Sequence, residues 1–171
     1  MIAEGCDNHM GSTITAKALV DAAINSGADA IKFQHHIVEQ EMLINDLSSD
    51  NFAEPLHEFL RVNALSLEQH YELKAYCDSR KITYLCTPFS YKAATEIQNL
   101  VPFFKIGSGE FQDYWYIDKL IELKKPILFS TGMCDESEIK SWLQKYSKII
   151  QDFALLNCIS EYPPKYEDLN I

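Results

Sequence analysis

The sequence lacks any long hydrophobic run and has few basic residues. No stretch of about 18 apolar residues occurs, so we expect no transmembrane helix. No basic segment followed by an apolar run opens the chain, so we expect no signal peptide. Lysine and arginine number 15 against 25 aspartates and glutamates, which gives a net charge of −10. Nucleic acids and anionic membranes bind basic surfaces, so neither is an expected partner, whereas a small anionic substrate could still bind a local basic pocket.

Cysteine is sparse and shows no pairing pattern. The five cysteines are odd in number and form no CxxC pair: Cys6, Cys77, Cys86, Cys134 and Cys158. This usage predicts reduced, mostly buried thiols in a cytoplasmic protein and argues against a disulfide framework.

The histidines also lack the spacing of a metal site. No HxxxH pair and no cluster of histidine with aspartate occurs in the sequence. His35 and His36 are adjacent, so on a strand their side chains face opposite ways. His9 is expected in a loop, and His57 and His70 in helical or solvent-exposed regions. We therefore expect no metal ligands within this chain.

The chain does contain a regular alternation of short apolar runs with amphipathic segments. The runs predict strands at 2–4, 30–34, 83–87, 103–106, 127–130 and 154–158. The 3.6-residue periodicity predicts helices at 13–26, 67–80, 91–99, 114–123 and 136–146, with Ser12 as a first N-cap and Gly27 as a stop. This order is typical of parallel βα units. The long connection 35–66, with a short helical piece near 55–62, is either a substrate-covering loop or a tolerated surface insertion.

Two architectures fit this order, an open doubly wound sheet and a (β/α)8 barrel. A dinucleotide-binding fold would carry GxGxxG after its first strand, but residues 5–11 read GCDNHMG. We therefore predict an α/β fold of the TIM-barrel type, truncated to about six βα units, which cannot close a barrel by themselves.

Two lysines within apolar strands are the sharpest chemical feature. Lys32 and Lys105 must each meet an anion or lose their charge if they point into a barrel. With Thr87, Ser108 and the backbone N–H groups of a glycine turn, they would form a site for phosphate or carboxylate. A salt bridge to a nearby glutamate is the structural alternative, and a Schiff base is the rival chemical role.

Two carboxylates stand at the same strand ends. Glu4 ends the first predicted strand and Glu110 follows the fourth. Facing one cavity, they could hold different protonation states and act as acid and base. For either residue, the alternative is a salt bridge to one of the two lysines.

Six motifs, in order, cover nearly the whole chain: IAEGCDNHMGS, DAIKFQHHIVEQEM, LCTPFS, FFKIGSGE, KPILFSTGM and LLNCISEYPPKYEDLN. In these motifs the chain resembles the N-acetylneuraminate (sialic acid) synthase family, which includes legionaminic and pseudaminic acid synthases. The resemblance implies a TIM barrel of the phosphoenolpyruvate-condensing type. It also implies that 1–171 is an incomplete synthase barrel domain, without the last barrel units and the C-terminal antifreeze-like domain.

The resemblance implies a reaction and its partners. Phosphoenolpyruvate condenses with an acylamino sugar such as N-acetylmannosamine, and phosphate leaves by C–O cleavage to give a nine-carbon 2-keto acid. A divalent metal, manganese or magnesium, is expected, with ligands that are not in this chain. Full-length members are expected to be homodimers in the cytoplasm.

Residue roles carry over at the matching positions. The resemblance implies phosphoenolpyruvate ligands at Lys32, Thr87, Lys105, Ser108 and Ser160, although some members have asparagine at the last position. It implies contacts to the sugar or the reacting centre at Glu4, Gln34, Asn51, Glu110 and Tyr162. In the first loop, Cys6 replaces a usual glycine and Gly5 a usually apolar residue.

Two other interpretations remain open from the sequence. The chain as such could be a catalytically inactive fragment or a degenerate binding module of the family. It could also belong to another phosphoenolpyruvate–aldose synthase, such as one that makes a heptulosonate or octulosonate, although the SEYP and IVEQEM segments argue against this.

Overall fold

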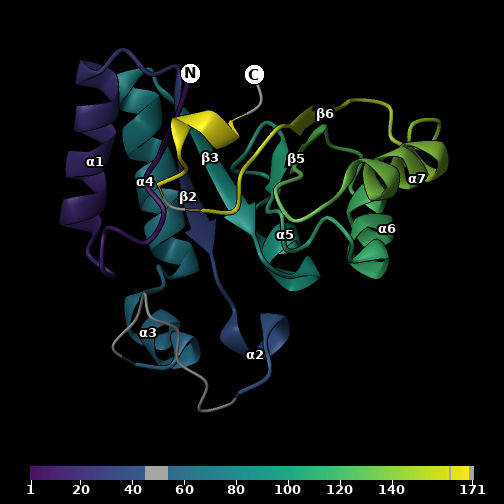
Figure 1. Cartoon of the computed structure of the whole chain (residues 1–171). Helices are drawn as coiled ribbons and strands as arrows, with labels where there is room; N and C mark the ends of the chain where they lie inside the picture. The colour runs from purple at the N-terminus through teal and green to yellow at the C-terminus, as the bar shows by residue number, and fades with distance from the viewer. Residues whose placement is uncertain (45–53, 162, 170–171) are drawn as a thin grey trace. The chain divides into compact units, whose positions relative to one another are not determined.

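The computed structural model describes residues 1–44, 54–161 and 163–169 of the chain (Figure 1). The chain divides into two compact units, Met1–Pro102 and Phe103–Ile171. Each unit is an α/β structure built on a three-stranded parallel sheet.

The first unit has the strand order β1-β2-β3. Its elements are β1 (Ile2–Glu4), α1 (Thr13–Asn25), β2 (Ala30–His35), α2 (Val38–Glu41), α3 (Leu56–Asn63), α4 (Leu67–Arg80), β3 (Thr83–Pro88) and α5 (Tyr91–Ile97). The parallel register pairs Glu4 with Lys32 and Gln34 with Thr87. Residues that are distant in sequence therefore meet at the carboxyl ends of the strands.

Helices α1 and α4 lie side by side in this unit (Figure 1). Tyr76 Oη donates to both carboxylate oxygens of Asp21 at 2.9 Å, which links the two helices. Ser12 caps α1 by accepting from the Thr15 N–H, as the sequence predicts, and Gly27 follows with a φ of +77°. Ser66 and Gln69 form a capping box that fixes the start of α4.

The second unit has the strand order β4-β5-β6. Its elements are β4 (Phe104–Ile106), α6 (Tyr114–Glu122), β5 (Ile127–Ser130), α7 (Glu136–Tyr146), β6 (Phe153–Leu156) and the 3₁₀ helix η1 (Tyr166–Asp168). Aromatic packing holds α7 against the sheet, because Trp142 lies 4.8 Å from Phe129 and 5.4 Å from Phe153 between ring centroids.

The predicted strands and helices are confirmed in order and type. The sixth strand lies at Phe153–Leu156 instead of 154–158. It starts one residue early, because Asp152 already accepts a backbone bond from Ile127, the first residue of β5. The sequence did not predict α2, a single turn of four residues within the long connection. The parallel α/β architecture is confirmed, while the described residues form two separate three-stranded sheets and no closed barrel.

The longest helix in the described ranges is α4, with 14 residues. That is shorter than the roughly 20 residues that a bilayer span requires, and none of the described helices qualifies as a membrane span.

Candidate active site

Lys32 is a buried cation in the first unit, and it lies between polar side chains at the ends of the neighbouring strands. Its Nζ lies 2.6 Å from Glu4 Oε2 and donates to Thr87 Oγ1 at 3.0 Å. Only 6% of Lys32 is exposed, whereas half of the Glu4 side chain is exposed. The parallel register of β1, β2 and β3 brings the three groups together. The salt bridge to a glutamate, which the sequence left open as an alternative, is therefore present.

Gln34 lies two residues after Lys32 on β2, on the same face of the strand, and is half-buried. Its Oε1 lies 3.1 Å from Nε2 of His36. Alternation along β2 thus places Lys32 and Gln34 together, as the sequence predicts.

The loop after β1 is bound tightly to the end of β2. The N–H of Gly5 donates to the Lys32 carbonyl at 2.8 Å, and the N–H of Cys6 donates to Glu4 Oε1 at 3.0 Å. A Cβ at Gly5 would lie 2.7 Å from Cε1 of Phe33, so this close approach requires glycine. Packing against Phe33 thus explains why Gly5 replaces a usually apolar residue of the family.

In the second unit, Lys105 is the matching buried cation. It is 8% exposed, and its Nζ donates to Ser130 Oγ at 2.6 Å and to the Ile106 carbonyl at 2.8 Å. Lys105 and Ser130 come from the adjacent parallel strands β4 and β5.

Two serine hydroxyls meet at Gly132 in the same unit. The Gly132 N–H donates to Ser108 Oγ at 3.0 Å. A Cβ at Gly132 would lie 2.8 Å from Ser160 Oγ and 3.1 Å from Ser108 Oγ. The structure therefore brings the hydroxyls of Ser108 and Ser160 close to Gly132, and glycine at this position leaves the space for both.

Glu110 is half-buried in the turn that follows β4, where its carbonyl accepts from the Asp113 N–H at 3.1 Å. Asn51 and Tyr162 lie outside the described residues. Lys32 and Thr87 lie in the first unit and Lys105 and Ser108 in the second, and their convergence on one site stays a prediction.

Among residues 1–44, 54–161 and 163–169, no group of three or more histidines, cysteines and carboxylates could hold a metal ion. The manganese or magnesium ion that the resemblance implies, with ligands outside this chain, stays a prediction.

His57 and His70 lie on helices, as predicted, and their exposed fractions are 6% and 0%. One expectation about side-chain burial was wrong in part. All five cysteines are free, as expected, but only Cys77 and Cys86 are buried. Burial raises the pKa of each of these two thiols to about 12, so both are protonated and unreactive near neutral pH.

Sequence reasoning missed a buried polar cluster beside Gln34. His36 Nδ1 lies 2.9 Å from Glu41 Oε1, and His36 Nε2 lies 3.5 Å from Asp7 Oδ2. Helical spacing does not link these residues, since they come from a loop, a strand end and a one-turn helix. In the sequence, the cluster was indicated only by the presence of two carboxylates, Asp7 and Glu41, within a few residues of the strand ends that carry the site.

Comparisons with known proteins place the chain in a family. A sequence model of the NeuB family matches residues 19–171. The protein MJ1065 of Methanocaldococcus jannaschii is 38% identical over 177 residues, covering 100% of this chain and 49% of the relative. The N,N'-diacetyllegionaminic acid synthase of Legionella pneumophila is 35% identical over 185 residues, covering 100% and 51%.

A solved structure agrees with these relatives. The N-acetylneuraminic acid synthetase of Leptospira borgpetersenii, in complex with citrate, matches with a TM-score of 0.82 and 26% identity over 99% of this chain and 57% of that one. The chain spans about half the length of the curated relatives it matches.

Proposed function

Because the chain belongs to the NeuB family, we propose that it carries the phosphoenolpyruvate-binding part of a (β/α)8 synthase barrel. The synthase condenses phosphoenolpyruvate with an acylamino sugar, N-acetylmannosamine or a relative of it. The product is a nine-carbon 2-keto sugar acid, and the other product is phosphate.

The observation that carries the proposal is the buried ammonium of Lys32, held between Glu4 and Thr87 at the end of a parallel strand. Burial of a charge is costly unless an opposite charge or hydrogen-bond acceptors meet it. The partly exposed Glu4 balances Lys32 before substrate binds. The substrate's phosphate or carboxylate takes over that role, with Lys105, Ser108 and Ser160 as further ligands.

Water is the third reactant, beside phosphoenolpyruvate and the sugar. C3 of phosphoenolpyruvate attacks the aldehyde carbon of the open-chain sugar and forms the new C–C bond. Water adds at C2, where positive charge develops, and gives up one proton while the sugar oxygen gains one. The tetrahedral adduct then breaks its C2–O bond to phosphate, and the remaining hydroxyl proton leaves with that phosphate. Glu4, once released from Lys32, and Glu110 are the groups that move these protons.

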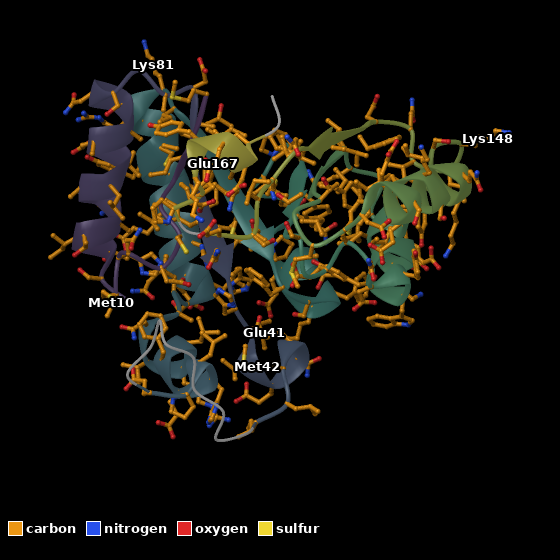
Figure 2. The ribbon with its side chains drawn as sticks, viewed as in Figure 1. Met10, Glu41, Met42, Lys81, Lys148 and Glu167 are labelled. Atoms are coloured by element: carbon orange, nitrogen blue, oxygen red, sulfur yellow. The ribbon has the colours of Figure 1, made fainter. Side chains whose placement is uncertain are left out.

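Calorimetric titration of the chain with phosphoenolpyruvate tests the binding part. The variant Lys32→Met should weaken binding roughly 10- to 100-fold, because it removes a charge-assisted contact. The matched control is Lys148→Met, since Lys148 is exposed after α7 (Figure 2) and should leave the affinity unchanged. No binding by the unmodified chain, or equal loss in both variants, would contradict the proposal.

The catalytic part is tested with the chain joined to the C-terminal half of the Legionella pneumophila relative, because this chain matches about half of that protein. Phosphate release should require both phosphoenolpyruvate and an acylamino sugar. Release with arabinose 5-phosphate or erythrose 4-phosphate in its place would favour a heptulosonate or octulosonate synthase. Phosphoenolpyruvate binding without release from any sugar would favour a binding module.

A further inference from the structure

A buried imidazole beside Gln34 has hydrogen-bond acceptors at both ring nitrogens. His36 Nδ1 lies 2.9 Å from Glu41 Oε1, and its Nε2 lies 3.1 Å from Gln34 Oε1 and 3.5 Å from Asp7 Oδ2. The exposed fractions of the His36, Glu41 and Asp7 side chains are 6%, 3% and 12%. Glu41 is the last residue of α2 (Figure 2).

This geometry favours the doubly protonated ring. A neutral imidazole can donate from only one nitrogen, so it could not donate both to Glu41 at Nδ1 and to Asp7 at Nε2, and a carboxylate can only accept. Burial alone lowers the pKa of His36, but the hydrogen bonds and charges of Asp7 and Glu41 raise it to about 9. The neighbouring histidines His9, His35 and His70 all have lowered pKa values, so they do not compete for this charge near neutral pH.

Three separate elements hold the ring in place. Asp7 comes from the loop after β1 and Glu41 from α2, while Phe89, just after β3, stacks on the ring at 4.4 Å between centroids and 15° between planes. The imidazole therefore has little freedom to turn away from its partners.

A cationic His36 fixes the orientation of the Gln34 amide. An imidazolium can only donate, so Gln34 must present its oxygen to His36 and direct its NH2 group elsewhere. Gln34 shares its strand face with Lys32 and pairs in register with Thr87, the two groups nearest to the proposed substrate. Gln34 therefore lies on the strand face that carries the proposed phosphoenolpyruvate ligands.

We propose that His36, held by Asp7 and Glu41, is a positioning residue that turns the NH2 of Gln34 toward an acceptor oxygen of the acylamino sugar. This inference rests on the proposed function for the identity of that sugar. The contact between His36 and Gln34 itself does not depend on it.

Two isosteric variants separate the two ends of the ring. In His36→Gln the side-chain NH2 replaces Nε2 and keeps the donor to Gln34, whereas in His36→Asn it replaces Nδ1 and keeps only the donor to Glu41. Nitrogen-15 NMR of the chain should show both His36 nitrogens protonated at pH 7.5. The side-chain NH2 resonances of Gln34 should shift in His36→Asn and stay nearly in place in His36→Gln.

Kinetics in the joined protein described above supply the second readout. His36→Asn should raise the KM for the acylamino sugar roughly tenfold, the cost of one misdirected hydrogen bond, with little change in the KM for phosphoenolpyruvate. His36→Gln should recover most of that loss. Gln34→Glu, which keeps an acceptor for His36 but has no NH2 group, should reproduce the effect of His36→Asn even if that variant fails to fold.

The outcomes are distinguishable from those of the proposed function. A singly protonated His36, or equal shifts of the Gln34 signals in both variants, would overturn the positioning role whatever the enzyme does. An unchanged sugar KM in both His36→Asn and Gln34→Glu, with phosphate release intact, would overturn this inference and leave the proposed function standing. Absence of phosphoenolpyruvate binding would overturn the proposed function and, with it, the role of Gln34 toward the sugar.

Discussion

Gly132 shows how a single missing side chain shapes the candidate site. A Cβ there would meet Ser160 Oγ at 2.8 Å and Ser108 Oγ at 3.1 Å, so Gly132→Ala must push at least one hydroxyl aside. We expect it to destabilise the chain by about 1–3 kcal/mol, the usual cost of overpacking. Phosphoenolpyruvate affinity should fall roughly tenfold, because the hydroxyls leave their positions. Thermal unfolding and calorimetric titration measure the two effects.

The matched control for this variant is Gly109→Ala. Nothing within the described structure lies within 4 Å of a Cβ at Gly109, and its φ is not positive. It should therefore leave both stability and affinity nearly unchanged. Equal effects of the two alanines would show that the Ser108 and Ser160 hydroxyls are not packed against Gly132.

At single positions, the sequence predicted side chains that follow strand alternation and missed those that depend on tertiary approach. Lys32 and Thr87 could be placed together because a period of two and parallel pairing fix their face. The contact of Gly5 with Phe33 could not be predicted, because it depends on how the loop after β1 bends back over β2. The role of His36 was missed for the same reason, since Asp7 and Glu41 reach it from separate elements.

At the level of elements, helix α4 presents one buried face to the sheet. His70, Leu73 and Cys77 are spaced for one helical stripe, and all three are fully buried. His70 Nδ1 lies 2.6 Å from the Tyr84 hydroxyl on β3, and the His70 ring packs at 4.6 Å from that of His35. The helix was predicted correctly, and its stripe could have indicated that His70 is buried.

The burial of His70 makes the stability of the folded chain depend on pH. Desolvation lowers the pKa of His70 to about 3 in the folded chain, against about 6.5 when unfolded. The neutral ring is favoured on folding, so its contribution to stability is complete above pH 6.5 and is lost as the pH falls toward 3. Between pH 6.5 and 5, the free energy of unfolding should drop by about 2 kcal/mol from this group.

Urea unfolding of the chain and of His70→Gln measures this contribution. The glutamine variant is less stable at pH 7.5, but it should lose less stability than the unmodified chain on going to pH 5. His36 does not confound this window, because its raised pKa costs stability only as the pH rises from 6.5 toward 9. Parallel loss of stability in both proteins would show that His70 is not the titrating group.

At the level of the whole chain, the order of the elements and the direction of the strands were predictable from the sequence. The way in which the strands join into sheets or a closed barrel was not. Alternating strands and helices predict parallel βα units, because a parallel connection requires a crossover. How sheets join depends on tilt and on pairing between strands far apart in sequence, which local patterns do not encode. The two sheets β1-β2-β3 and β4-β5-β6 agree with the predicted units, and the interpretation of 1–171 as one incomplete barrel domain stays a prediction.

Strand β6 forms one edge of the sheet in the second unit, and this has a consequence for the chain in solution. Its residues alternate between half-buried and exposed, and the side chain of Leu156 is among the exposed large hydrophobic groups. An edge strand with an apolar exposed face can pair with a second copy of itself. We therefore expect the chain to self-associate at micromolar concentration, with an elution volume that depends on concentration in size-exclusion chromatography.

A charge at the edge opposes such pairing, so Leu156→Lys should raise the dissociation constant roughly tenfold or more. Ile14→Lys is the matched control, because Ile14 is 82% exposed on α1 and lies on no strand. A concentration-independent monomer, or the same shift in both lysine variants, would show that β6 is not the associating edge.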